Sequence, residues 1–237
     1  MSTRRVGVLG GTFDPIHLGH LAAARAARHA IGLDEVLFVP SSDPPHRPDK
    51  PRASGYHRLQ MTALAVAGEP GCSVSEIELQ RPGASYTFDT LTALKEADHG
   101  RSQFFFIVGA DAFADIATWS RYPAVIDLAA FAVIARPGTS LESLQRQRPD
   151  LAARMRVVPT GSTLAGFSGS ASIATSSIAL IPAETPQVSS TEIRRRAAAG
   201  ESLNRLVPDE VEQYIIAHRL YRPQSQEPRS QSLEPKA

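Results

Sequence analysis

Five short runs of apolar residues recur along the chain, separated by segments too long for hairpin turns. They occupy residues 6–9, 36–39, 104–108, 131–135 and 178–181. Each run has the length and unbroken hydrophobicity of a strand that is buried on both faces of a sheet. A weaker alternation of apolar and polar residues over 72–79 indicates a further strand.

The segments between these runs have helical length and character. Residues 18–30, 57–67, 88–97 and 141–155 each predict a helix. Strands that alternate with helices favour a parallel sheet, because the connection between two parallel strands is long enough to hold a helix. The pattern therefore predicts an α/β fold with a doubly wound parallel sheet.

Two segments differ from the rest in composition. Residues 160–177 are mostly Ser, Thr, Gly and Ala, which bury too little apolar surface to order a segment, so we expect a flexible insertion. Residues 223–237 predict a disordered tail. We expect a single domain over residues 1–222.

Composition and charge narrow the classes of partner. With 25 Lys+Arg against 24 Asp+Glu, the chain has no broad cationic field, so nucleic acid is not an expected partner. The single cysteine, Cys72, excludes an internal disulfide and a Cys-rich metal site. No apolar run approaches the roughly 20 residues of a membrane helix, and the N-terminus lacks the apolar core of a signal peptide. We expect a cytoplasmic protein with no membrane partner.

Unusual polar sequences follow all five apolar runs. They occupy residues 10–20, 41–47, 109–111, 136–138 and 189–194. In an open parallel sheet, ligands bind beyond the carboxyl ends of the strands. We therefore expect the five sequences to meet at one edge of the sheet and to form one ligand site.

The first of these sequences has the composition of a phosphate site. Adjacent Gly10 and Gly11 permit a tight turn and a close approach of the backbone to a ligand. Pro15 favours a helix that starts just after it, with His17 and His20 at positions i and i+3 on one face. Two imidazoles beside the free N–H groups of a helix N-terminus favour phosphate oxygens.

Two other interpretations of this sequence stay open. It is also compatible with a glycine turn before an ordinary core helix that carries two incidental histidines. A metal site built from Asp14, His17 and His20 is the second alternative. Zinc pairs on a helix more often use i and i+4, and no matching cluster occurs elsewhere, so we expect no protein metal ligands.

The last of the five sequences has the form of a capping box. Ser189 should accept a hydrogen bond from the N–H of Glu192, whose side chain should reach back to the cap. Arg194, Arg195 and Arg196 lie about 100° apart around the predicted helix, so at most one or two of them can face a ligand. The others should be solvated.

Other positions are weaker candidates. Asp111 follows a predicted strand, where a doubly wound fold holds an acid against a ribose hydroxyl. Trp119, the only Trp, either packs in the core or stacks on a ligand ring. Thr87 or Asp89 is a candidate cap for the helix that follows.

These motifs resemble a known superfamily. Residues 10–20 and 189–194 are similar to the two signatures of the nucleotidyltransferases with a His-x-Gly-His motif. Within that superfamily, residues 44–47, 86–91, 109–119 and 136–138 resemble the bacterial nicotinate-nucleotide adenylyltransferase family. The resemblance covers residues 6–222 and implies a Rossmann-like sheet. The Ser-rich segment 160–177 is longer than the resemblance leads us to expect.

The resemblance implies a reaction. AMP would pass from ATP to nicotinate mononucleotide, which gives deamido-NAD (nicotinate adenine dinucleotide) and pyrophosphate in NAD biosynthesis, with Mg²⁺ carried on the ATP. Such a transfer needs no protein nucleophile, so positioning and charge stabilisation should supply most of the acceleration. Nicotinamide mononucleotide as acceptor is the nearest alternative, and a nucleotide-binding regulator without turnover is a more distant one. Assembly into a homo-oligomer is left open.

The resemblance also assigns roles by position. His17, His20 and Arg194 would contact the phosphates of ATP as catalytic residues. Further ATP contacts would come from Gly10, Gly11, Thr12, Phe13, Gly109, Asp111, Ser189 and Ser190. Contacts to the nicotinate nucleotide would come from Ser41, His46, Arg47, Thr87, Trp119 and Arg136.

Overall fold

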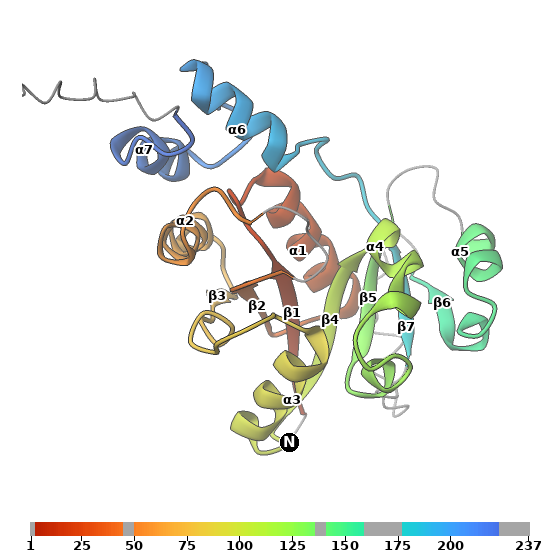
Figure 1. Cartoon of the computed structure of the whole chain (residues 1–237). Helices are drawn as coiled ribbons and strands as arrows, with labels where there is room; N and C mark the ends of the chain where they lie inside the picture. The colour runs from red at the N-terminus through yellow and green to blue at the C-terminus, as the bar shows by residue number, and fades with distance from the viewer. Residues whose placement is uncertain (1–2, 45–49, 136–140, 159–176, 223–237) are drawn as a thin grey trace, which may run out of the picture.

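The fold is a parallel sheet covered by helices on both faces (Figure 1). The structure is a computed structural model, and it describes residues 3–44, 50–135, 141–158 and 177–222. The strands are β1 (Arg4–Gly11), β2 (Glu35–Pro40), β3 (Cys72–Val74), β4 (Ser102–Gly109), β5 (Ala130–Ala135), β6 (Met155–Val157) and β7 (Ile178–Pro182). Their order is β3-β2-β1-β4-β5-β7-β6, and all neighbours are parallel. The five predicted strands are confirmed.

Helices pack on both faces of this sheet. They are α1 (Leu18–Ile31), α2 (Gly55–Ala67), α3 (Thr87–Asp98), α4 (Ala110–Ala114), α5 (Leu141–Gln147), α6 (Ser190–Ala199) and α7 (Asp209–Ala217). Short 3₁₀ turns η1 (Ile116–Thr118), η2 (Ala124–Asp127) and η3 (Ala152–Arg154) complete the described elements. None of the described helices is long and apolar enough to cross a membrane.

Alternation along the strands separates two hydrophobic clusters. Phe105 of β4 belongs to the cluster that contains buried residues of α1, α2, α6 and α7. Its neighbour Phe106 belongs to the cluster that contains buried residues of α3, α4 and α5. Successive side chains of a strand point to opposite faces, so both faces of the sheet are buried. This arrangement confirms the predicted doubly wound sheet.

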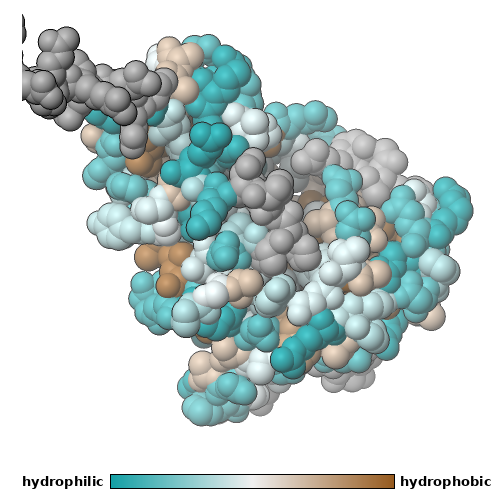
Figure 2. Space-filling model, in the orientation of Figure 1, coloured by the Kyte–Doolittle hydropathy of each residue, from teal (hydrophilic) through white to brown (hydrophobic). Residues whose placement is uncertain are grey.

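The surface is mostly polar outside these clusters. On the face drawn in Figure 2, hydrophilic residues cover α6, and hydrophobic residues form small separate areas. Among the described residues, the exposed large hydrophobic side chains are Tyr56, Val157 and Ile216. Scattered apolar residues of this kind are normal for a folded protein surface.

The point that positions a ligand lies between β1 and β4. From β1 the chain continues outward to β2 and β3, whereas from β4 it continues in the opposite direction to β5 and β7. The helices after β1 and β4 therefore lie on opposite faces and leave a crevice at the carboxyl ends of these two strands.

Two element predictions are wrong in extent. The helix predicted over 141–155 ends at Gln147, because Pro149 disfavours helical backbone in the residue before it, and the chain goes on to an unpredicted edge strand, β6. The strand predicted over 72–79 ends at Val74, where the Ser75 side chain accepts a hydrogen bond from the N–H of Ile77 and the chain turns.

The two segments of unusual composition cannot be compared with the structure. Residues 160–176 of the predicted insertion and all of the predicted tail, 223–237, lie outside the described residues. The single-domain prediction for 1–222 therefore stays a prediction, although the described elements share one sheet.

Candidate functional site

A cavity of about 550 Å³ opens at the carboxyl ends of the strands, across the point where the chain direction reverses. Its wall includes Gly10 of β1, Ser41 after β2, Gly109 of β4 and Ser189 before α6. These residues come from four of the five polar sequences, which confirms that those four meet at one edge. The volume lies in the range of small-molecule sites.

Most of the residues assigned to the site lie in this wall. Those in the wall are Gly10, Gly11, His17, His20, Ser41, Thr87, Gly109, Trp119, Ser189 and Ser190. Thr12, Phe13, Asp111 and Arg194 lie next to the cavity without lining it. His46, Arg47 and Arg136 lie outside the described residues.

His17 and His20 form a stacked pair at the start of α1. Their ring centroids lie 3.7 Å apart with an angle of 18° between the planes. His17 is the N-cap rather than a helical residue, and its N–H donates a hydrogen bond to Nδ1 of His20 at 3.2 Å. An Nδ1 that accepts leaves Nε2 of the neutral His20 ring to carry the proton. The pair therefore presents a defined N–H donor.

Phe13, and not the glycines, makes the turn before α1. Its φ of 47° lies in the left-handed region, while Gly10 and Gly11 are the last residues of β1. The buried Phe13 ring packs edge-on against His20, with centroids 5.0 Å apart. A Cβ on Gly11 would lie 2.7 Å from that ring. The tight-turn explanation for Gly11 is therefore wrong, because Gly11 makes room for the Phe13 ring.

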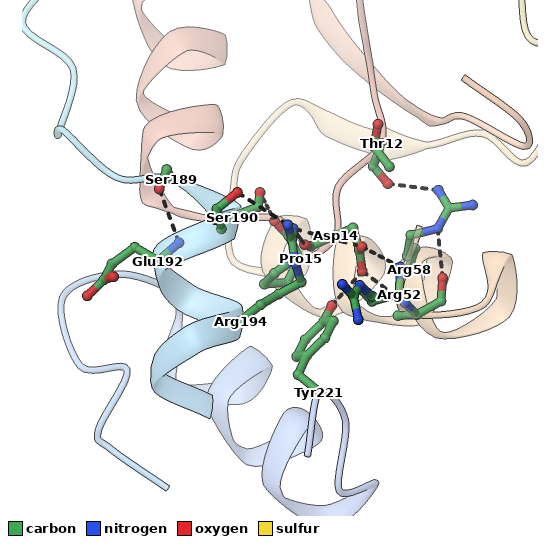
Figure 3. Close-up of polar contacts among 12 residues, drawn as sticks. Thr12, Asp14, Pro15, Arg52, Arg58, Ser189, Ser190, Glu192, Arg194 and Tyr221 are labelled. Atoms are coloured by element: carbon green, nitrogen blue, oxygen red, sulfur yellow. Dashed lines mark hydrogen bonds and ion pairs between the residues drawn. The ribbon is translucent and has the colours of Figure 1, made fainter. Parts of the chain in front are cut away.

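Asp14 anchors the loop from behind (Figure 3). Its carboxylate accepts hydrogen bonds from the N–H groups of Arg52 at 2.8 Å and Ala53 at 3.1 Å, and from the Tyr221 hydroxyl at 2.9 Å. Arg194 donates to the carbonyl of Asp14 at 2.7 Å. Both oxygens of the Asp14 carboxylate accept hydrogen bonds from these partners, which disfavours Asp14 as a metal ligand beside His17 and His20. The described residues include no group of three side chains placed to bind a metal ion.

Arg58 ties three backbone segments together beside this loop. The side chain is 2% exposed, and its guanidinium donates to the carbonyls of Thr12, Ala53 and Ser42 at 2.7, 3.2 and 3.4 Å. Burial lowers the pKa of Arg58. Thr12 follows Gly11 and Ser42 follows Ser41, and both Gly11 and Ser41 line the cavity. Arg58 therefore fixes the ends of β1 and β2 relative to α2.

The predicted start of α6 is confirmed, but only half of the predicted capping box forms. Ser189 Oγ accepts from the N–H of Glu192 at 3.2 Å. The Glu192 carboxylate does not reach back: it accepts from Arg195 and Arg196, and these hydrogen bonds lower its pKa to about 2. Of the three arginines, Arg194 alone turns toward the loop before α1, as expected from their spacing.

Thr87 and Trp119 line the cavity on the face of the sheet that α3 and α4 cover, opposite the face that carries α1 and α6. Thr87 is the first residue of α3, and the cap position is Tyr86, so the prediction that Thr87 or Asp89 is the cap is wrong. Asp89 lies in the first turn, where a negative charge is favourable. Trp119 packs edge-on against Phe106, with centroids 5.8 Å apart, and also lines the cavity. It combines core packing with a ligand-facing surface.

Asp111 lies apart from the other candidates. It is exposed in the first turn of the short helix α4, while its neighbours Gly109 and Ala112 line the cavity. A contact with a ribose at the mouth of the cavity stays a prediction.

Glu78 is a cavity residue that the sequence does not indicate. The side chain is 6% exposed, and burial raises its pKa. Its carboxyl accepts a hydrogen bond from Thr90 Oγ at 2.6 Å, and Thr90 and Ser85 line the cavity with it. Among the described cavity residues it is the one acidic side chain. Its partner is 12 residues away, and no local motif marks such a pair.

The cavity thus has two chemically distinct walls. The donor wall consists of His17, Gly19, His20, Ser189, Ser190 and Thr191. It brings the N-termini of α1 and α6 together, and the positive ends of the two helix dipoles favour anions there. The aromatic wall consists of Glu78, Ser85, Thr87, Thr90, Phe106 and Trp119. A ligand with a polyanionic part and a ring fits this division.

Comparisons with known proteins point the same way. The Cytidylyltransferase-like family model matches residues 8–196. The chain is 43% identical to the "Probable nicotinate-nucleotide adenylyltransferase" of Geobacter sp. strain M21, over 92% of this chain and 98% of the relative. It is 40% identical to the protein of the same name from Trichlorobacter lovleyi, over 92% of this chain and 100% of the relative.

Solved structures share the fold. The Plasmodium falciparum nicotinic acid mononucleotide adenylyltransferase complexed with NaAD matches with a TM-score of 0.65 and 20% identity. The match covers 92% of this chain and 97% of that one. At this identity the likeness supports the architecture of the sheet and its helices.

Proposed function

Because this chain belongs to the cytidylyltransferase-like family, we propose that it is a nicotinate-nucleotide adenylyltransferase. It transfers AMP from ATP to nicotinate mononucleotide and releases deamido-NAD and pyrophosphate, a step of NAD biosynthesis. The observation that carries this function is the donor wall opposite the aromatic wall, in a chain similar to these relatives over most of its length.

The donor wall holds the triphosphate. An oxygen of the acceptor's phosphate attacks the α-phosphorus of ATP, and the bond from that phosphorus to the oxygen leading to the β-phosphorus breaks. No protein nucleophile takes part. The Nε2–H of His20 and the positive end of the α1 dipole stabilise the charge that develops on the α-phosphate. Ser189, Ser190 and Arg194 hold the phosphates that leave.

Mg²⁺ fits this site when it is bound to the phosphates of ATP rather than to protein carboxylates. Asp14 is engaged by Tyr221 and two backbone N–H groups, and Glu78 lies in the aromatic wall. The described donor wall therefore offers no carboxylate to a cation. The phosphate oxygens of ATP are suitable ligands instead, because Mg²⁺ commonly binds substrate phosphates and keeps several of its waters. Bound there, it neutralises part of the triphosphate charge.

The aromatic wall receives the nicotinate nucleotide. Trp119 offers a ring surface for stacking on the pyridine, and the hydroxyls of Ser41 and Thr87 lie within the same cavity. In the sequence, His46 and Arg47 come after β2 and Arg136 comes directly after β5. By the family resemblance, we assign all three to the same ligand. Asp111 is assigned to a ribose hydroxyl.

Parallel assays with two acceptors test this function. Purified protein receives ATP and Mg²⁺ with either nicotinate mononucleotide or nicotinamide mononucleotide, and dinucleotide and pyrophosphate are followed together. We expect faster turnover of the acid, with one pyrophosphate for each dinucleotide. Faster turnover of the amide would move the specificity. Binding of ATP without any dinucleotide from either acceptor would instead identify a regulator.

Location and assembly are part of the proposal. We place the enzyme in the cytoplasm, where ATP is supplied and where the free thiol of Cys72 stays reduced. The net charge of +1 supports small-molecule substrates over nucleic acid. Light scattering on the purified protein will show whether a homo-oligomer forms.

A further inference from the structure

Tyr221 reaches the loop of the donor wall from the far end of the described chain. Its hydroxyl donates to Asp14 Oδ1 at 2.9 Å across 207 residues of sequence. Figure 3 shows the ring pointing at Asp14 from the segment after α7. The family model ends at residue 196, so Tyr221 lies outside the matched region.

The Tyr221 hydroxyl is a permanent donor. Burial, together with the nearby charge of Asp14, raises the pKa of Tyr221 well above its ordinary value. The phenol therefore keeps its proton at any pH at which the enzyme works, and the hydrogen bond to the carboxylate is charge-assisted.

Arg194 makes a long ion pair with the Asp14 carboxylate and donates its hydrogen bonds elsewhere. Its Nη1 lies 3.9 Å from Asp14 Oδ2, beyond hydrogen-bond distance, while the same atom donates to the Asp14 carbonyl at 2.7 Å. The other terminal nitrogen donates to Thr191 Oγ at 3.2 Å, at the edge of the cavity. The side chain is 21% exposed, so it has room to move.

The other partners of the carboxylate explain this separation. Tyr221 and the N–H groups of Arg52 and Ala53 supply three donors to the two oxygens of Asp14. Arg58, which also lies near Asp14, is held by three carbonyls. Arg194 already lies within ion-pair distance of Asp14 Oδ2, so it is the side chain placed to move closer if a donor is removed.

We propose that Tyr221 is a positioning residue for ATP: by satisfying Asp14, it keeps the guanidinium of Arg194 available to the phosphates. This inference rests on the proposed function, in which Arg194 holds the leaving phosphates. Without the hydroxyl, the long ion pair between Arg194 and Asp14 shortens to a hydrogen bond and draws the charge of Arg194 away from the cavity.

Two matched variants test the inference. Tyr221→Phe removes the hydroxyl that binds Asp14, and Tyr214→Phe removes a hydroxyl of α7 that binds His57 Nδ1 at 2.9 Å instead. We expect Tyr221→Phe to raise KM for ATP about tenfold, the scale of one charge-assisted hydrogen bond. KM for the acceptor should change less than about twofold. Tyr214→Phe should leave both constants unchanged.

A double-variant cycle separates positioning from folding. In an Arg194→Ala background, Tyr221→Phe should have no further effect on KM for ATP, because the residue it acts through is gone. A lower melting temperature with an unchanged KM for ATP would overturn the inference, as would an equal rise in KM in the Arg194→Ala background.

Calorimetry distinguishes this inference from the proposed function. Titration of ATP and Mg²⁺ into the wild-type protein and Tyr221→Phe needs no acceptor and no turnover. If no dinucleotide forms with any acceptor, the proposed function fails, yet about tenfold weaker ATP binding by Tyr221→Phe still supports the positioning role. Equal affinities overturn it.

Discussion

The donor wall and the aromatic wall of the cavity face each other and are built in opposite ways. In the donor wall, imidazole and hydroxyl groups at the N-termini of α1 and α6 line the cavity. The aromatic wall combines the Trp119 ring with a buried carboxyl, Glu78. A charged triphosphate is therefore favoured on one side only, and the cavity imposes a direction on any ligand that has an anionic part.

The two walls also differ in their support. Behind the donor wall, Asp14 and Arg58 hold the loop through backbone groups as well as side chains. In the aromatic wall, Glu78 and Thr90 hold each other. Donors that are fixed before the ligand arrives lose little free energy to reorganisation during the reaction. The support from Asp14 and Arg58 thus lies beside the wall that we propose for the triphosphate.

The largest effect should come from the donor wall. His20→Ala removes the donor that we propose for the α-phosphate, and we expect kcat to fall about 10²- to 10³-fold with little change in KM for the acceptor. Steady-state kinetics with both substrates varied will show this. His29→Ala alters an exposed histidine in the last turn of the same helix and should be silent. Equal losses in the two variants would contradict the assignment.

A smaller effect should come from the opposite wall. Trp119→Ala removes the stacking surface, and we expect KM for the acceptor to rise about tenfold or more, with KM for ATP nearly unchanged. Trp119→Phe keeps an aromatic face and should recover part of the loss. A rise in KM for ATP alone would place the adenine, rather than the pyridine, on Trp119.

The smallest effect should be a pH dependence of stability. Burial raises the pKa of Glu78, so the folded protein favours the neutral form. The stabilisation is therefore full at acidic pH and is lost as pH rises through the folded-state pKa. Between about pH 5 and pH 8, the melting temperature of Glu78→Gln should gain on wild type by about 2–4 °C, the shift for 1 kcal/mol in a domain of this size.

Glu76→Gln is the control for that measurement. Glu76 is exposed two residues away and bonds only to Gln80 in its own turn among the contacts described. Its replacement should leave the pH dependence of the melting curve unchanged. A Glu78→Gln variant that loses stability relative to wild type as pH rises would contradict burial of a neutral carboxyl.

Sequence predicted the parts of the molecule that depend on local pattern. The apolar runs located five strands, and the rule for parallel sheets then placed Gly10, Ser41, Gly109 and Ser189 at one edge. The spacing of His17 and His20 predicts that they lie close together, although not that His17 caps the helix or that the two rings stack. These features need only period and order along the chain.

The missed features depend on partners that are distant in sequence. Arg58 and Tyr221 reach Thr12 and Asp14 across 46 and 207 residues, and nothing next to them announces the contact. At Gly11 the pattern predicts a tight turn, whereas the structure needs a glycine there because the Phe13 ring folds back over it. Tertiary packing decides which of these distant side chains meet, and the local pattern of residues along one sequence does not show those contacts.

The hydrogen bond from Tyr221 to Asp14 also sets an order in time. Asp14 is synthesised long before two of its partners, since Arg194 follows 180 residues later and Tyr221 follows 207 residues later. At ordinary elongation speeds this interval is roughly 10–40 s. During it, β1 and β2 can pair while the loop between β1 and α1 lacks its clasp. The loop before α1 therefore gains its contacts with Arg194 and Tyr221 only after every strand of the described sheet has been synthesised.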